Sequence, residues 1–205
     1  MVYSIFVEGD ADKRLLEQLL DYLNLSDYQG KVIKTNGYTN LLAEKTEQTY
    51  LNQMLHTSDD GGVNLVIFDA DTDFKQRESE ILGWKEKHQV EFELFLFPNN
   101  EEEGELEDLL ERMINPENQP VIDCWTGFED SLKVIDLPWK KGEALTIPAK
   151  KTKIYAYLEV LLGTSRSEKD KIKEKNRDYR NADHWNLNAP ALVGLVDFLQ
   201  RFLKD

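Results

Sequence analysis

Residues 63–73 read VNLVIFDADTD, and this stretch decides the fold that we predict. Its residues 65–68 form a continuous apolar run, which is typical of a strand buried on both faces of a parallel sheet. Acids follow at positions 69, 71 and 73. Ligands of open α/β sheets bind beyond the carboxyl ends of the strands, so we expect Asp69 and Asp71 at the edge where such a sheet carries its chemistry. The same pattern also fits a solvated acidic turn that caps the following helix.

Strands and helices alternate on both sides of this stretch. β-Branched and aromatic segments predict further strands, and leucines spaced three and four residues apart predict a packed helix after Asp10. The predicted strands cover residues 2–7, 31–35, 65–68 and 92–97. One predicted helix begins at Asp10, and three others cover residues 41–55, 74–88 and 105–114. This alternation predicts an α/β fold with a mostly parallel sheet and helices on both faces.

The alternation fades after Pro116. Helices are predicted over residues 153–162 and after the start signal at Asn188 to Pro190, whereas the charged segment 166–180 fits either a solvated helix or a mobile loop. We therefore predict an α/β domain over residues 1–115 and a mainly helical C-terminal extension over residues 116–205 that packs on it.

The composition limits the function. The 205 residues carry a formal net charge of -14, with 40% hydrophobic and 31% charged residues. This charge argues against a nonspecific phosphate-binding surface, but it leaves room for a local basic groove or for phosphate contacts bridged by a metal ion. The single cysteine, Cys124, excludes an internal disulfide and fits a reducing compartment. With no signal-peptide pattern and no apolar run of membrane-spanning length, we expect a cytoplasmic protein without a membrane partner.

Two further acids belong to the first predicted strand and helix. Glu8 and Gly9 close the strand, and Asp12 follows in the first helical turn. Adjacent parallel strands lie about 4.8 Å apart, so Glu8 reaches an ion held by Asp69 and Asp71 if their strands are neighbours. Mg²⁺, or Mn²⁺ in its place, is the cation that we expect, because both prefer carboxylate oxygens. The alternative is that Glu8 and Asp12 are ordinary acids at a helix N-terminus.

The sequence resembles the Toprim domain, because it has Glu8-Gly9 at the end of one predicted strand and Asp69-x-Asp71 at the end of another. That domain is shared by topoisomerases, primases, recombination-repair proteins and the OLD-family nucleases. Residues 95–100 (FLFPNN), residues 104–110 (GELEDLL) and the tail 185–203 are similar to those of small bacterial and phage Toprim-like proteins of uncharacterised function. The Toprim motifs cover roughly the first 115 residues, and the similarity to the small proteins covers most of the chain.

The resemblance implies a metal site and a reaction class. In the Toprim domain the glutamate and the Asp-x-Asp pair surround Mg²⁺, which implies that Glu8 is a general acid or base, or a ligand. OLD-family nucleases also carry an acid four residues after this glutamate and a Glu after the fourth strand. Asp12 and Glu107 occupy the matching positions, which implies a second metal site. The chain departs from that family in lacking its ATPase domain and the basic surface of a free-standing nuclease.

The extension adds one catalytic candidate. Lys153 belongs to a group of lysines at the start of a predicted helix. A lysine near the acids would stabilise a phosphate or a leaving oxygen, and we expect Lys153 to serve in this role. A solvated basic face is the alternative.

The sequence therefore favours Mg²⁺-dependent phosphodiester or phosphoryl chemistry on nucleic acid, as in a nuclease. The alternative is a Toprim-like module without turnover, which binds a metal ion, a nucleotide or a partner protein. A third interpretation rests on residues 68–72, FDADT, which resemble the haloacid-dehalogenase phosphatases. Those enzymes place a threonine four residues after the nucleophilic aspartate, and Asp73 stands there in this chain, so we disfavour it. The substrate, the number of metal ions and the oligomeric state stay open.

Overall fold

The computed structural model describes residues 2–26, 30–43 and 47–204, and a four-stranded sheet lies at its centre. The strands are β1 (Tyr3–Val7), β2 (Gly30–Lys34), β3 (Val63–Asp69) and β4 (Glu93–Phe97). They lie in the order β2-β1-β3-β4 and are all parallel, which confirms the predicted α/β fold. Because β1 and β3 are direct neighbours, their carboxyl ends lie side by side at one edge of the sheet.

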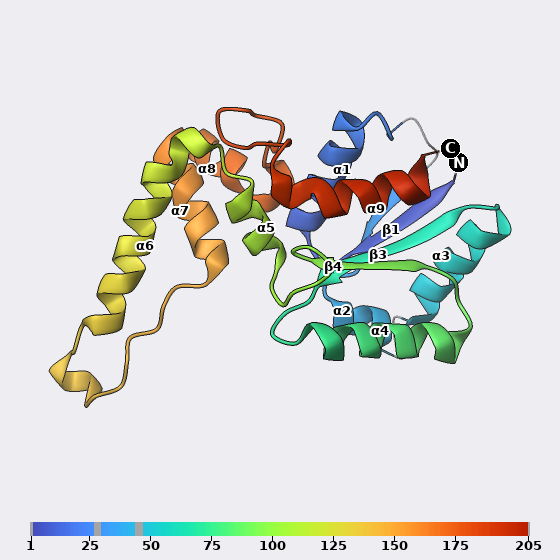
Figure 1. Cartoon of the computed structure of the whole chain (residues 1–205), viewed down its shortest axis with the longest axis horizontal. Coiled ribbons are helices and arrows are strands. Elements are labelled where there is room, and N and C mark those ends of the chain that lie inside the picture. Colours follow the sequence, from blue (N-terminus) through green and yellow to red (C-terminus); the bar gives the residue numbers. More distant parts are fainter. Residues whose placement is uncertain (1, 27–29, 44–46, 205) are drawn as a thin grey trace.

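Helices cover both faces of the sheet (Figure 1). One face carries α1 (Asp10–Tyr22) and α9 (Val193–Leu203), and the other carries α2 (Tyr38–Leu42), α3 (Glu47–Asp59) and α4 (Phe74–His88). Successive strand residues point to opposite faces, so Ile5 packs in the core under α1 and Phe6 packs in the core under α3 and α4. Burial on both faces is the reason that the central strands β1 and β3 are largely apolar, whereas the edge strand β2 has the sequence GKVIK and carries two lysines.

The helical region after β2 corrects one prediction. The sequence predicts a single helix over residues 41–55, whereas the structure has α2, which ends at Leu42, and α3, which begins at Glu47. Ala43 adopts extended backbone with a ψ of 129°, and this ends α2. Residues 44–46 lie outside the described part of the chain.

The rest of the chain is mainly helical. It comprises α5 (Leu106–Arg112), α6 (Gln119–Val134), α7 (Lys150–Leu162), α8 (Arg166–Ile172) and, at its end, α9. α6 and α7 extend side by side away from the sheet and are joined by residues 135–149 (Figure 1). Within the described ranges, no helix has both the length and the apolar character needed to cross a membrane.

The first part of the charged segment 166–180 is the mostly exposed helix α8, as the solvated-helix alternative predicts, whereas its last part is partly buried. Arg177 and Tyr179 lie in the interior beside α1. The Gln18 side chain of α1 makes this burial feasible, since its amide donates to the Arg177 carbonyl (2.8 Å) and accepts from the Tyr179 N–H (2.7 Å). Backbone polar groups that enter a protein interior need such partners.

Candidate functional site

Four acids from four different elements gather at the carboxyl edge of the sheet. Glu8 follows β1, Asp12 lies in the first turn of α1, Asp69 ends β3 and Glu107 lies in the first turn of α5. Burial raises the pKa of each of these carboxyl groups, and the negative charges of the others add to the shifts of Asp12 and Asp69. We call these four residues the acidic cluster.

Glu8 is held by backbone groups of two other segments. Its Oε1 accepts a hydrogen bond from the Asp69 N–H, and its Oε2 accepts one from the Tyr38 N–H, both at 3.0 Å. Burial raises the pKa of Glu8, and these two hydrogen bonds oppose the shift because they stabilise the carboxylate. The side chain is therefore fixed in place while each oxygen retains a lone pair for a further contact.

Asp12 has one oxygen with a partner and one without. Its Oδ2 accepts from the Gly9 N–H at 2.9 Å, which closes the N-terminus of α1. Its Oδ1 is buried and has no hydrogen-bond partner within the described ranges. Burial raises the pKa of Asp12 to about 7, and the charges of Glu8 and Glu107 contribute to this shift. A buried carboxylate oxygen without a partner is costly, so it calls for a proton or a cation.

Asp69 connects β3 with α5. Its Oδ1 accepts a hydrogen bond of 2.7 Å from the Leu106 N–H at the start of α5. Burial, followed by the charges of Asp12 and Glu8, raises the pKa of Asp69 to about 9. Without a bound cation, burial and the neighbouring charges therefore favour the protonated form of the Asp69 carboxyl group. Crowded carboxylates behave in this way when no cation compensates them.

Asp71 lies beside the acidic cluster but is engaged elsewhere. Its backbone has a φ of 54° and exchanges two hydrogen bonds of 2.8 Å with Gly104. Its carboxylate forms an ion pair with the buried Arg77 guanidinium, which also lies 3.9 Å from Glu8 Oε1 and stacks on the Tyr38 ring at 3.2 Å from its centre. An internal cation thus already compensates Asp71.

The acidic cluster offers suitable atoms for a hard divalent cation, although the side chains do not form a finished coordination shell. All of its donors are carboxylate oxygens, which Mg²⁺ prefers, and Asp12 Oδ1 has no hydrogen-bond partner in the part of the chain that the structure describes. Across the parts of the chain that the structure describes, no three His, Cys, Asp or Glu side chains stand close enough together to hold an ion. An ion would therefore have to draw the carboxylates together by side-chain rotation.

A family description, "Protein of unknown function (DUF3226)", matches residues 2–204. The chain belongs to the DUF3226 family. Its match runs through both the sheet and the helical extension. No curated protein and no solved structure matches the chain.

Lys153 of this DUF3226 chain lies apart from the acidic cluster. Its Nζ is 2.6 Å from Glu111 Oε1 at the far end of α5, and its side chain lines an apolar cavity between α6 and α7 with Trp125 and Tyr157. Within the described ranges, its only ion pair is with Glu111. The expected contact of Lys153 with the acids is therefore absent from the structure, and its prediction as a catalytic residue gains no geometric support.

Three other cations lie close to the acids. The sequence did not single out Arg77 or Arg177 for the site, and it considered Lys151 only as a member of the same lysine group as Lys153. Arg77 pairs with Asp71, and the positive charges of Lys151 and Arg177 lower the pKa of Glu107, opposing the larger effect of its burial. Lys151 is itself paired with Glu174. The sequence could have selected Lys151, in place of Lys153, as the lysine near the acids only if the face of α7 turned toward Glu107 had been known.

Proposed function

We propose that the acidic cluster binds Mg²⁺ or Mn²⁺ and that the protein carries out phosphodiester or phosphoryl chemistry on nucleic acid at this edge of the sheet. One observation carries the proposal. Four acids from four separate elements lie at one edge of the sheet, where Asp12 is buried and the other three are partly buried, and Asp12 Oδ1 has no hydrogen-bond partner among the described residues. A bound ion would polarise a phosphate and lower the pKa of a water molecule.

The residues of the chain have separate roles in this proposal. Asp12, Asp69 and Glu107 would hold the cation, because their charges repel one another without it. Glu8 would hold or move the proton of the attacking group, since two backbone hydrogen bonds fix its position and burial raises its pKa. The resemblance of Glu8-Gly9 and Asp69-x-Asp71 to the Toprim domain supports the same reaction class.

A second candidate function is a binding module without turnover. The observation in its favour is Arg77, which neutralises Asp71 and lies near Glu8. A fixed internal cation reduces the need for a metal ion at that side of the site. The net charge of -14 also disfavours a free-standing nuclease.

Metal binding is the first step to test. The metal-free protein would be titrated with Mn²⁺ by calorimetry, together with Asp12→Asn and the matched control Asp10→Asn, which lies in the same helical turn and pairs with Lys34 at 2.7 Å. We expect binding by the wild type and the control, and loss of binding in Asp12→Asn. Absence of binding by the wild type would refute the proposed site.

Turnover is tested second, at low ionic strength, because the acidic surface weakens binding of a polyanion. Single-stranded, double-stranded and supercoiled DNA and RNA would be incubated with Mg²⁺ or Mn²⁺, with Glu8→Gln as the inactive control. If Mn²⁺ binds and none of these substrates is cleaved or joined, the binding-module function replaces the enzyme.

A further inference from the structure

A cavity of about 440 Å³ opens between α1, α7, α8 and residues 176–185. Its wall contains four cationic residues and one acidic residue, namely Arg14, Lys171, Arg177, Arg180 and Asp178, together with His184, whose pKa is lowered by burial. We call it the basic cavity. In a chain with a net charge of -14, such a local excess of positive charge is unusual and calls for a counter-charge.

Most of its cations have no carboxylate partner. Within the described ranges, Arg14, Lys171 and Arg177 form no ion pair, whereas Arg180 Nη1 lies 2.5 Å from Asp21 Oδ2. The positive charges of the first three are therefore available to a ligand.

Arg177 is the most informative of them, because it is only 2% exposed. Its guanidinium donates to the Ile172 carbonyl at 3.3 and 3.4 Å and to the Tyr179 hydroxyl at 3.1 Å. These neutral acceptors satisfy N–H groups, and among the described residues no carboxylate forms an ion pair with the guanidinium, although its charge acts on Glu107 at longer range. A buried charge without a counter-ion is costly, so a bound anion would stabilise this arrangement.

A second buried donor on the wall also lacks an acceptor. Trp185 lines the basic cavity and is 2% exposed, and its indole Nε1–H has no hydrogen-bond partner within the described ranges. A tetrahedral oxyanion accepts hydrogen bonds at several oxygens. It therefore matches a wall of guanidinium, ammonium and indole donors.

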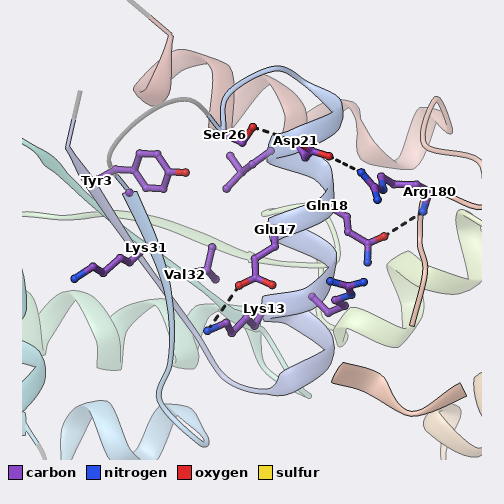
Figure 2. A pocket seen from close by; sticks show the side chains of 12 residues that line it. Tyr3, Lys13, Glu17, Gln18, Asp21, Ser26, Lys31, Val32 and Arg180 are labelled. Carbon is purple, nitrogen blue, oxygen red and sulfur yellow. Dashed lines mark hydrogen bonds and ion pairs between the residues drawn. The ribbon is translucent and has the colours of Figure 1, made fainter. Parts of the chain in front are cut away.

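The adjoining cavity, which shares Arg14 and Arg180, provides a contrast (Figure 2). There Lys13 lies 3.7 Å from Glu17, and Arg180 lies 2.5 Å from Asp21. Figure 2 shows these pairs along one side of α1. Within the described ranges, two of the four cations of this adjoining cavity are thus paired with an acid, against one of the four arginines and lysines of the basic cavity.

We propose that the basic cavity binds a phosphate group, with Arg14, Lys171 and Arg177 as its cationic donors. The guanidinium fork suits two oxygens of such a group, and the lysine adds a mobile charge. The basic cavity shares no residue with the acidic cluster, although the charge of Arg177 acts on Glu107, and phosphate binding there needs no metal ion. Its test can therefore succeed or fail independently of the proposed function.

The test is a titration of the metal-free full chain, in EDTA and at low ionic strength, with inorganic phosphate and pyrophosphate by calorimetry. The variants are Lys171→Gln, at an exposed position, and the double substitution Arg14→Gln with Lys171→Gln. The matched control, Lys13→Gln with Lys175→Gln, removes the same charge from the same two regions of the chain but outside the basic cavity. Circular dichroism confirms that each variant folds.

We expect wild type and control to agree within about twofold. The double variant should bind pyrophosphate about tenfold more weakly or worse, because charge-assisted hydrogen bonds are lost. No binding by the wild type, or equal weakening in variant and control, would overturn the proposal. A 5′-phosphorylated oligonucleotide that binds more tightly than pyrophosphate would identify a nucleic-acid strand as the source of the phosphate. Equal affinities would identify a small phosphate compound.

Discussion

Glu8 Oε1 accepts a hydrogen bond of 3.0 Å from the backbone N–H of Asp69, and this contact joins the ends of the two central strands. Through its other oxygen, the same carboxylate also binds the Tyr38 N–H at the start of α2. The Glu8 side chain thus connects the end of β1 with the end of β3 and the start of α2. Its position is set before any ligand arrives, which is the arrangement that a preorganised site requires.

The metal-free protein should lose stability as the pH rises from about 4 to about 9. Asp12 and Asp69 have folded-state pKa values of about 7 and about 9, above the ordinary value of 3.8, so the folded state retains protons that the unfolded state releases. Each such group lowers the free energy of unfolding by about 1.4 kcal/mol per pH unit between its two pKa values. Urea denaturation in EDTA at several pH values measures this slope. Asp69→Asn should flatten it above pH 7, and an unchanged slope would contradict the assignment.

Asp12→Asn should stabilise the metal-free protein and abolish its stabilisation by Mn²⁺. The asparagine oxygen can still accept from the Gly9 N–H, while repulsion with Glu8 and Glu107 disappears. A gain of about 1 kcal/mol corresponds to a rise in Tm of roughly 2–4 °C for a chain of this size. Thermal melts with EDTA and with Mn²⁺ test both effects. Asp10→Asn should keep the Mn²⁺ effect, and its loss there would point to a general charge effect.

Arg77→Gln should destabilise the protein by about 1–3 kcal/mol, since it leaves two acids without their cation. This loss of stability is smaller than the loss expected for a fully buried ion pair, because the Asp71 side chain is 47% exposed. Adding Asp71→Asn should recover part of the loss. Denaturation of the single and double variants forms a double-mutant cycle, and strictly additive losses would show that the ion pair contributes nothing.

Leu199→Ala should cost about 2–5 kcal/mol, because this side chain of α9 is completely buried in the core and its removal leaves a cavity. Val193→Ala, in the exposed first turn of the same helix, should stay within about 0.5 kcal/mol of wild type. Urea denaturation of both variants tests whether α9 is part of the main core. Equal stability of the two variants would exclude that role.

The edge position of Glu8 and Asp69 could be predicted from the sequence because it depends only on where apolar runs end. Such runs predict the strands, and parallel strands place their carboxyl ends at one edge. The helix boundary near Ala43 could not be predicted in this way, since residues on both sides of it have helical spacing.

The partners of individual side chains were harder to predict from the sequence than the strands. Asp71 follows β3 as predicted, but its backbone is left-handed and its carboxylate is engaged in an ion pair with Arg77, which the sequence did not indicate. Lys151 and Lys153 are two residues apart, which separates them by roughly 200° around a helix. They therefore lie on nearly opposite faces, and the sequence alone does not indicate which of these two faces is turned toward the acids. Arg177 lies in a charged segment without periodicity, and its burial depends on Gln18, a distant polar residue.

The contact between α9 and the sheet has a consequence for synthesis of the protein. The Phe198 ring of α9 lies 5.3 Å from the Phe95 ring of β4, although about 100 residues of chain separate the two elements. At roughly 5–20 residues per second, this part of the sheet stays uncovered for roughly 5–20 s after β4 leaves the ribosome. The nascent chain therefore presents an aromatic surface to chaperones during that interval, and the fold closes only once α9 has emerged.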